Sequence, residues 1–425
     1  MKFISTTGDA QRFSFKEAVL QNLAPDGGLF IPESIPELNL SDEKILLLNQ
    51  FELLFKLLQP FVSDDLNDEV LKNIISTALD FEIPLKQIGD SAIYSLDLFH
   101  GPTWALKDVG ARFLAGCLSH WSSDNQETTI LVATSGDTGG AVANAFYQVA
   151  GTRVIILYPL GKISPLQEQQ IAGLGSNIEA IAVKGTFDDC QQLVKTAFRD
   201  DALKNSITLT SANSINIARW IPQMIFYGIA YREALKSNLP GIICVPSGNY
   251  GNIAAGLLAH AMGMEFSSYL AAHNANDTVP RYIETGIYEP HPTLATIANA
   301  MDVSDPSNFI RFQWLMNTMG SNAPKFSARS IDDQEIVAAI RDCYFQYKYL
   351  LDPHSATAWK VLKDHGRKGI ILSTAHPQKF EETIVSALGS YPEEWKLAIE
   401  TNPINRIVME NSYSGLRSIL LEIKK

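Results

Sequence analysis

Short apolar stretches alternate with amphipathic ones through the middle of the chain, from Thr129 to Ala272. The apolar stretches have strand length, and they predict strands at 130–134, 154–158, 178–183, 207–210, 242–245 and 269–272. The stretches between them repeat with a helical period and predict helices at 141–150, 166–174, 188–198, 217–235 and 253–262. This alternation indicates a parallel sheet with right-handed crossovers, in which ligands bind at the carboxyl ends of the strands.

The flanking regions follow other patterns. The first ~90 residues are expected to be mainly helical by their periodicity, with one amphipathic helix at 45–61 that packs on a core. Residues 277–307 are rich in proline and turn formers. A helix is predicted near 333–351, and a strand at 369–373 leads into the sequence Thr-Ala-His-Pro.

Length, charge and cysteine spacing indicate which classes of protein the chain can belong to. The chain has 425 residues, of which 46% are hydrophobic, so two or three domains with a substantial core are expected. A net charge of −12 argues against a nucleic-acid partner. The four cysteines are far apart in apolar patterns, which indicates buried free thiols in a reducing compartment. Zinc-ligand spacing, a signal peptide and a membrane-length apolar stretch are all missing, so we expect a cytoplasmic protein without a metal or a membrane partner.

Lys107 is a candidate for a reactive residue, and it lies in the run Phe-His-Gly-Pro-Thr-Trp-Ala-Leu-Lys-Asp. A strand-like alternation precedes a Gly-Pro turn, and a helical pattern begins at Asp108. An amine at the start of a helix, among apolar neighbours, has a lowered pKa, as a Schiff-base lysine requires. Most lysines are surface residues, however, and this run alone favours that interpretation.

Two glycine-rich turns strengthen the case. Ser135-Gly136-Asp137-Thr138 follows one predicted strand, and Gly248-Asn249-Tyr250-Gly251-Asn252 follows another. Each opens a predicted helix, and the N–H groups at a helix N-terminus bind anions. Either turn alone could be an ordinary strand-to-helix turn. Neither fits a P-loop or a dinucleotide fingerprint, whereas both together with a reactive lysine suit pyridoxal 5'-phosphate and an amino-acid substrate.

With these motifs, the chain resembles the threonine synthases, in particular their long bacterial and fungal form. The resemblance rests on the Lys107 run and on segments 133–139, 158–168, 211–216, 246–251, 276–281, 299–304 and 374–377. It implies an α/β fold of the fold-type-II pyridoxal-phosphate class (tryptophan synthase β-like), with two parallel-sheet domains and a mainly helical N-terminal region. It also implies the conversion of O-phospho-L-homoserine and water to L-threonine and phosphate.

The resemblance assigns roles to the cofactor and carboxylate residues. Lys107 is then the Schiff-base lysine, residues 248–252 hold the cofactor phosphate, and the hydroxyl of Thr374 faces the pyridine nitrogen. Residues 135–138 receive the substrate carboxylate. Asp137 stands where related β-replacement enzymes have asparagine, so its side chain is expected to point away or to cap the helix.

The substrate phosphate needs its own partners. By resemblance to the shorter threonine synthases, these are Asn213, Ser214 and Arg219, whose planar guanidinium can bond two oxygens. Lys162 is a second candidate, although a solvated lysine in a turn is an equal alternative. Leu160 departs from the family, because some long-form members have arginine there, which puts a phosphate role for this position in doubt.

The expected domains are an N-terminal region at 1–92, a smaller α/β domain at 129–209 and a larger cofactor domain formed by 93–128 and 210–425. The sequence leaves open whether the protein is a monomer or a homodimer. The alternatives to a threonine synthase are another fold-type-II lyase, such as a serine or threonine dehydratase or a β-replacement enzyme, and a non-catalytic paralogue that binds the cofactor. A nucleotide-binding α/β protein is disfavoured by the missing fingerprints.

Overall fold

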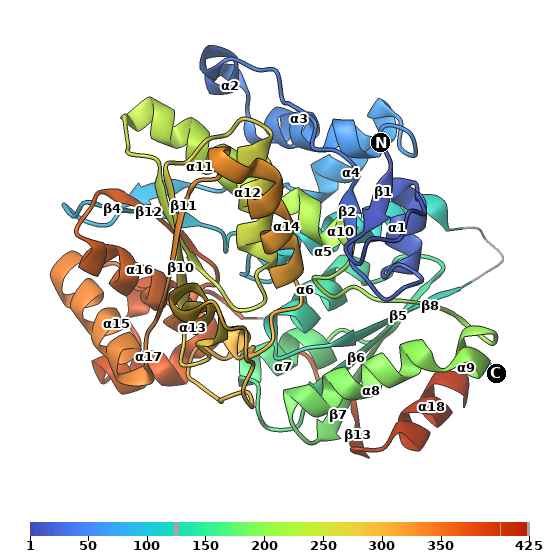
Figure 1. Ribbon diagram of the computed structural model, residues 1–425. Coiled ribbons are helices and arrows are strands. Elements are labelled where there is room, and N and C mark those ends of the chain that lie inside the picture. Colours follow the sequence, from blue (N-terminus) through green and yellow to red (C-terminus); the bar gives the residue numbers. More distant parts are fainter. Residues whose placement is uncertain (123–126, 400, 423–425) are drawn as a thin grey trace.

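The computed structural model describes residues 1–122, 127–399 and 401–422. Two main sheets, one of six strands and one of five, are each covered by helices, as Figure 1 shows. The five-stranded sheet lies at the lower right of that view, and the six-stranded sheet lies at the left. This arrangement confirms the α/β class predicted from the alternating pattern.

The smaller sheet has the strand order β13-β7-β6-β5-β8, and all its strand pairs are parallel. Every residue of its central strand β6 is buried, because helices and connections cover both faces. Its strands are β5 (Thr128–Ala133), β6 (Thr152–Pro159), β7 (Ile178–Lys184), β8 (Thr208–Thr210) and β13 (Arg406–Glu410). Its helices are α6 (Asp137–Phe146), α7 (Pro165–Ala172), α8 (Phe187–Arg199), α9 (Asp201–Lys204) and α18 (Tyr413–Glu422).

The larger sheet has the order β11-β10-β9-β12-β4-β3, and only the β3–β4 pair is antiparallel. Its strands are β3 (Leu85–Gln87), β4 (Ile93–Asp97), β9 (Ile242–Pro246), β10 (Ser268–His273), β11 (Lys325–Ser330) and β12 (Gly369–Ser373). The helices that follow them are α5 (Lys107–Trp121), α12 (Gly251–Ala261), α13 (Thr278–Thr285), α14 (Phe309–Met319), α15 (Asp333–Tyr347), α16 (Pro353–His365) and α17 (Glu381–Leu388).

The N-terminal region is mainly helical, as predicted, but it also contains a two-stranded antiparallel sheet of β1 (Phe3–Ser5) and β2 (Phe30–Pro32). Its helices are α1 (Phe15–Gln21), α2 (Asp42–Leu47), α3 (Gln50–Val62) and α4 (Asp68–Ala78). The predicted helix at 45–61 is thus two helices. Asn49 ends the first because it caps the second, in a capping box with Glu52.

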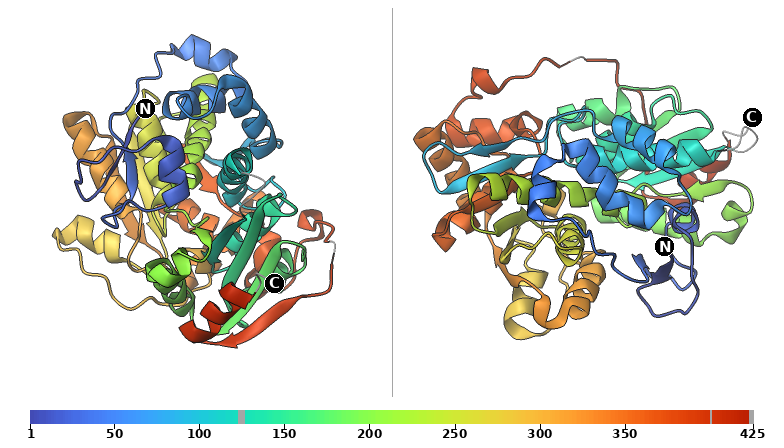
Figure 2. Two further views of the ribbon diagram at one scale, coloured as in Figure 1. Left: turned by 90° about the vertical axis from the view of Figure 1, so that its right-hand side faces the viewer. Right: turned by 90° about the horizontal axis from the view of Figure 1, so that it is seen from above.

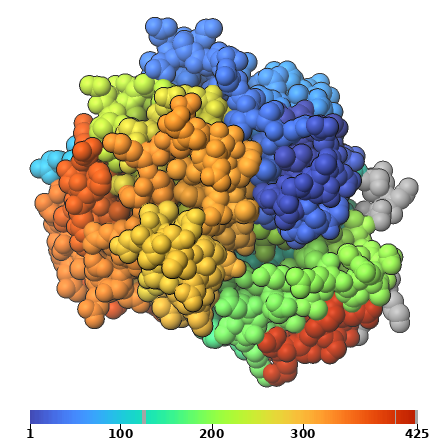
Figure 3. All heavy atoms as spheres, in the orientation of Figure 1, coloured from blue at the N-terminus to red at the C-terminus, as the bar shows by residue number. Residues whose placement is uncertain are grey.

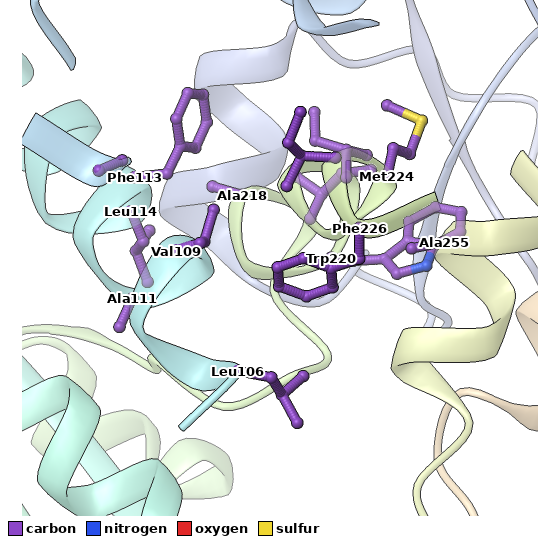
Figure 4. Close-up of a cluster of buried hydrophobic side chains, with 14 of the residues drawn as sticks. Leu106, Val109, Ala111, Phe113, Leu114, Ala218, Trp220, Met224, Phe226 and Ala255 are labelled. Carbon is purple, nitrogen blue, oxygen red and sulfur yellow. The ribbon is translucent and has the colours of Figure 1, made fainter. Parts of the chain in front are cut away.

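The predicted helix at 217–235 is also broken. The structure has α10 (Ile217–Trp220), a 3-10 turn η1 (Ile221–Gln223) and α11 (Met224–Ser237). Pro222 lies in the break, and proline cannot donate an N–H to a continuous helix. Figure 4 shows the apolar cluster that packs here, in which Ala218 of α10 lies beside Val109 of α5 and the ring of Trp220 extends toward Ala255 of α12.

Three segments differ from the expected domain boundaries. β13 and α18 belong to the smaller sheet and its helices, although 210–425 is expected to form the larger domain. β3 belongs to the larger sheet, although it lies within the expected N-terminal region 1–92. β8, in the smaller sheet, ends at Thr210, one residue beyond the expected boundary. Figures 1 and 2 show the C-terminal segment, in red, beside the green helices of the smaller domain. β13 was missed because it is a largely exposed edge strand without a buried apolar run. Residues 123–126, 400 and 423–425 of the expected larger domain lie outside the described residues.

The N-terminal region lies next to the smaller domain on one face of the molecule. In Figure 3, the N-terminal residues in blue cover the side of the molecule above the green residues of the smaller domain. Among the described residues, every helix is too short or too polar to cross a membrane.

Candidate active site

Lys107 is the first residue of α5 and lies at the carboxyl end of β12. The turn before it contains Trp104 in the left-handed region, with φ of 58°. Ala105 forms an antiparallel bridge with Ala375, and the N–H of Leu106 donates to the carbonyl of Thr374 at 2.9 Å. These two contacts fix the start of α5 against the segment that leaves β12.

The environment of Lys107 favours the neutral amine. Burial, and after it the positive charge of Arg219, lowers the pKa of Lys107 to about 8, while the carboxylate of Asp137 partly opposes both effects. The two charged neighbours come from two helices that are far apart in the sequence, Asp137 from the start of α6 and Arg219 from α10. An amine with this pKa can act as nucleophile and as proton carrier near neutral pH.

The pKa of Lys107 can be measured by its reactivity. In ligand-free protein, acylation of Lys107 should rise through a midpoint near pH 8, since only the neutral amine reacts, whereas an ordinary lysine titrates near ~10.4. Asp137→Asn should lower this midpoint and Arg219→Gln should raise it, because each removes one charge. Peptide mass spectrometry over a pH series measures the rates. A midpoint above pH 10, or no response to either variant, would contradict the described surroundings of Lys107.

The turn after β9 forms the first anion cradle. Tyr250 adopts a left-handed conformation, with φ of 60°, at the N-cap of α12. A Cβ atom on Gly248 would lie 2.8 Å from the Cα of Met301, so only glycine fits there. The side chain of Asn252 accepts from the hydroxyl of Tyr227 at 2.8 Å and donates to the Oε1 of Gln223 at 3.2 Å. Because this side chain is already engaged, the backbone N–H groups are the donors that the start of α12 offers to an anion.

A second turn is joined directly to this cradle. The amide of Asn249 donates to the hydroxyl of Ser214 at 2.8 Å, and its amide oxygen accepts from the N–H of Ser307 at 2.6 Å. The structure therefore brings together the turn at 213–216 and the turn at 248–252, as the assigned roles require.

Arg219 is a buried cation with spare hydrogen-bonding capacity. It is 2% exposed, and its Nη1 donates to the carbonyl of Ala212. Its buried Nε has no hydrogen-bond partner in the structure, and the buried amide oxygen of the neighbouring Asn213 has none either. Burial lowers the pKa of Arg219 to about 10, with partial compensation by Asp108, so the side chain is charged at neutral pH. A buried, charged guanidinium of this kind is a ready anion site.

The turn after β5 forms the other cradle. Gly136 has φ of 132°, and a Cβ atom there would lie 2.3 Å from the Cδ of Gln167. The hydroxyl of Thr134 accepts from the N–H groups of Gly136 and Gly139, at 2.9 and 2.8 Å. Among the described residues, the N–H groups of Asp137 and Thr138 have no hydrogen-bond partner, as is usual in the first turn of a helix.

The side chain of Asp137 is held by Lys379, a residue that the sequence analysis did not identify. Its Oδ1 lies 2.9 Å from the Nζ of Lys379 and accepts from the Nε2 of Gln167 at 3.0 Å. Burial alone would raise the pKa of Asp137, but Lys379, His354 and Gln167 together hold it below its usual value. Of the two expectations for Asp137, pointing away or capping the helix, the cap does not occur, because Gly136 is the N-cap of α6 and no side chain caps this helix. The need of a buried carboxylate for a cation was the signal that could have indicated Lys379.

Two further candidates differ in position. Thr374 is buried at the end of β12, and its N–H donates to the hydroxyl of Ser355 at 3.1 Å. Lys162 is exposed in the turn after β6, where its positive charge contributes to lowering the pKa of Asp189 at the start of α8. Within the described part of the chain, no contact joins Lys162 to the other candidate residues. No cluster of three or more potential metal ligands occurs there either.

Two family models match the chain. Residues 73–373 match the model described as "Pyridoxal-phosphate dependent enzyme", and residues 2–79 match "Threonine synthase N terminus". The threonine synthase of Haemophilus influenzae is 42% identical over 420 residues, which cover 97% of each chain. That of Escherichia coli is 41% identical over 394 residues, which cover 92% of this chain and 91% of the relative.

Solved structures agree with these matches. The crystal structure of threonine synthase from Escherichia coli superposes with a TM-score of 0.92 at 38% identity and covers 100% of both chains. The structure described as PLP-bound threonine synthase from Brucella melitensis gives a TM-score of 0.88 at 31% identity and covers 99% of both. The fold-type-II architecture and the pyridoxal-phosphate cofactor predicted from the motifs are thereby confirmed, and this chain belongs to the threonine synthase family of pyridoxal-phosphate-dependent enzymes.

Proposed function

We propose that this protein converts O-phospho-L-homoserine and water to L-threonine and phosphate. The observation that carries the proposal is Arg219, a buried cation beside Lys107. Within the described part of the chain, the Nε atom of Arg219 has no hydrogen-bond partner. A fold-type-II enzyme that acts on an unphosphorylated amino acid needs one site for the cofactor phosphate and one for the carboxylate. Arg219 with Asn213 provides a further anion site, and this fits a substrate that carries a phosphate of its own.

The cofactor fits the residues around Lys107. The N–H groups of 248–252 at the start of α12 would hold its phosphate, and the close approach of Met301 to Gly248 supports a cradle shaped by backbone. The amine of Lys107 would bind its aldehyde carbon, and the hydroxyl of Thr374 would face its ring nitrogen. When bound, pyridoxal phosphate supplies an electron sink for negative charge that develops on the amino-acid substrate.

The substrate would then contact two turns. The free N–H groups of Asp137 and Thr138 at the start of α6 would bind its carboxylate, together with Ser135 and Gly136. Arg219, Asn213 and Ser214 would bind its phosphate and hold it while it leaves from Cγ. Lys162 is exposed and has no contact in the described structure that favours it over Arg219.

Lys107 is the residue that we assign to proton transfer. After the substrate amine has displaced it from the cofactor, its free amine can take the proton from Cα, release that proton to bound water and then take one from Cβ. The proton from Cβ can pass to Cγ once phosphate has left. Water then adds its oxygen at Cβ, and a proton returns to Cα before threonine is released. A pKa of about 8 suits one amine to both directions of transfer.

The proposal is tested by product balance. Purified protein supplied with pyridoxal phosphate and O-phospho-L-homoserine should form L-threonine and inorganic phosphate in equal amounts. A protein that instead deaminates serine or threonine, without releasing phosphate, would be a dehydratase of the same fold. A protein that binds the cofactor but turns over none of these compounds would be a non-catalytic paralogue.

The phosphate cradle can be tested with a matched pair of variants. Gly251→Asp and Gly251→Asn add side chains of almost equal size, next to Asn308 and Ser214. The added carboxylate should repel the cofactor phosphate at the helix N-terminus, so Gly251→Asp should lose pyridoxal phosphate on dialysis much faster than Gly251→Asn. Cofactor absorbance after dialysis measures the loss, and circular dichroism checks the fold. Equal retention by the two variants would contradict a phosphate site at this turn.

A further inference from the structure

Lys379 is the most deeply buried lysine near the site, and neither cofactor nor substrate binding accounts for it. It lies in the 3-10 turn η4 (Pro377–Phe380) after β12, and its side chain is 0% exposed. Its Nζ reaches three oxygen atoms: Oδ1 of Asp137 at 2.9 Å, the carbonyl of Thr103 at 2.7 Å and Oε1 of Gln170 at 2.9 Å. An ammonium has three N–H donors, so all of them are used.

The three acceptors belong to separate parts of the fold. Thr103 lies in the turn that leads to Lys107, Asp137 opens α6 and Gln170 lies in α7. Lys379 itself follows a strand of the larger sheet, whereas α6 and α7 follow strands of the smaller sheet. One ammonium therefore joins elements of both sheets at the point where the two halves of the site meet.

Further hydrogen bonds connect the same elements. Gln170 also donates to the carbonyl of Thr103 at 3.2 Å, and Gln167 donates to Asp137. Gln167 is fixed in turn, because its Oε1 accepts from the N–H of Ser164 in the capping box of α7. The position of Asp137 relative to the Lys107 turn is thus set by two paths, one through Lys379 and one through α7.

Stability alone does not explain why this ion pair is buried. Taking both charges out of water costs free energy that their attraction repays only in good geometry, so a buried ion pair is weak evidence for stability. The helix start does not need the carboxylate as a cap, because Gly136 occupies the N-cap position. What the pair does provide is a fixed place for the backbone of Asp137 and Thr138, whose N–H groups are free for a ligand.

We propose that Lys379 is a positioning residue that holds the 135–138 turn at a fixed distance from Lys107 through its contacts with Asp137, Thr103 and Gln170. The 135–138 turn and the amine of Lys107 must contact the same substrate molecule at the same time. A change in the distance between them would therefore misplace the substrate Cα relative to Lys107. This inference rests on the proposed function for its catalytic consequence, but not for its structural one.

The test uses the holoenzyme and a double-variant cycle. Lys379→Met leaves an uncompensated buried carboxylate and should lower the melting temperature. Lys379→Met combined with Asp137→Asn removes both charges and should recover most of that loss. Hydrogen exchange of peptides covering 134–146 and 99–107 should remain faster than in the wild type in both variants. The matched control is the exposed pair Lys184–Glu410 at 2.5 Å, for which Lys184→Met and Glu410→Gln should change neither readout.

The kinetic readout separates positioning from folding. In the stability-restored double variant, kcat/KM for O-phospho-L-homoserine should still be lower by about 10²-fold, since a misplacement near 1 Å can cost that much. The affinity for L-threonine should fall as well, because it uses the same carboxylate turn. Wild-type exchange and wild-type threonine affinity in the double variant would overturn the proposal. The exchange result holds whichever amino acid the enzyme transforms, so it decides the inference even if the proposed reaction is wrong.

Discussion

Lys107→Ala should reduce threonine formation by at least about 10²–10⁴-fold, the range typical for loss of a single general acid–base group. The residue begins α5, is fixed by the bond from the N–H of Leu106 to Thr374, and has a pKa lowered to about 8. Alanine is compatible with the helix start and removes the side chain beyond Cβ, including the reactive amine. Borohydride reduction of the wild-type holoenzyme, followed by peptide mapping, should attach the cofactor to Lys107.

The variant should still fold and should still bind some pyridoxal phosphate through the 248–252 turn, because that turn holds the phosphate without the lysine. Fluorescence of the bound cofactor and the melting temperature measure these two properties. Lys107→Arg is the matched control, since it keeps a positive charge but cannot form the bond to the cofactor. Attachment of the cofactor to any other lysine, or normal turnover in Lys107→Ala, would overturn the assignment.

Arg219→Ala should lower kcat/KM for O-phospho-L-homoserine by about tenfold to hundredfold, which corresponds to a charge-assisted hydrogen bond of ~1.5–3 kcal/mol. Threonine lacks the phosphate, so its affinity should change little. Arg219→Lys should restore only part of the loss, because a point charge does not reproduce the planar fork. Steady-state kinetics and equilibrium titration with threonine measure the two effects.

Arg112→Ala is the control for Arg219. It removes an arginine from α5 whose guanidinium pairs with Asp80 near the surface, away from any buried anion site. It should leave kcat/KM unchanged. If Arg219→Ala weakens threonine and O-phospho-L-homoserine equally, Arg219 supports the fold through the carbonyl of Ala212, and the phosphate site would have to be sought around Lys162.

The buried parallel strands were the most predictable part of the fold. β6 and β9 consist entirely of buried residues, so each appears in the sequence as an apolar run with clear ends. The edge strands β11 and β13 escaped prediction because their residues alternate in exposure or are mostly exposed. Helix breaks were missed where one polar or proline residue, Asn49 or Pro222, changes the local hydrogen bonding without changing the apolar period.

The candidate site shows the same division. Residues in glycine-rich turns could be found because a helix N-terminus after a strand has a local sequence signature. The contact between Asp137 and Lys379 could not, because it joins two segments that are adjacent only after both sheets have formed. The spacing of residues in the sequence carries no information about such a pair. Only the chemical need of a buried carboxylate for a cation points to it.

The pairing of β13 with β7 determines when the smaller sheet can be completed during synthesis of the chain. During synthesis, β7 appears long before β13, and until residues 406–410 have left the ribosome it presents an unpaired strand edge. The strands of the larger sheet β9 to β12 are all made within that interval. The smaller sheet is therefore completed only after every strand of the larger sheet has been made, which departs from the usual N-terminal-first order of domain folding. During that interval the open edge of β7 is the place where strand-to-strand aggregation would begin.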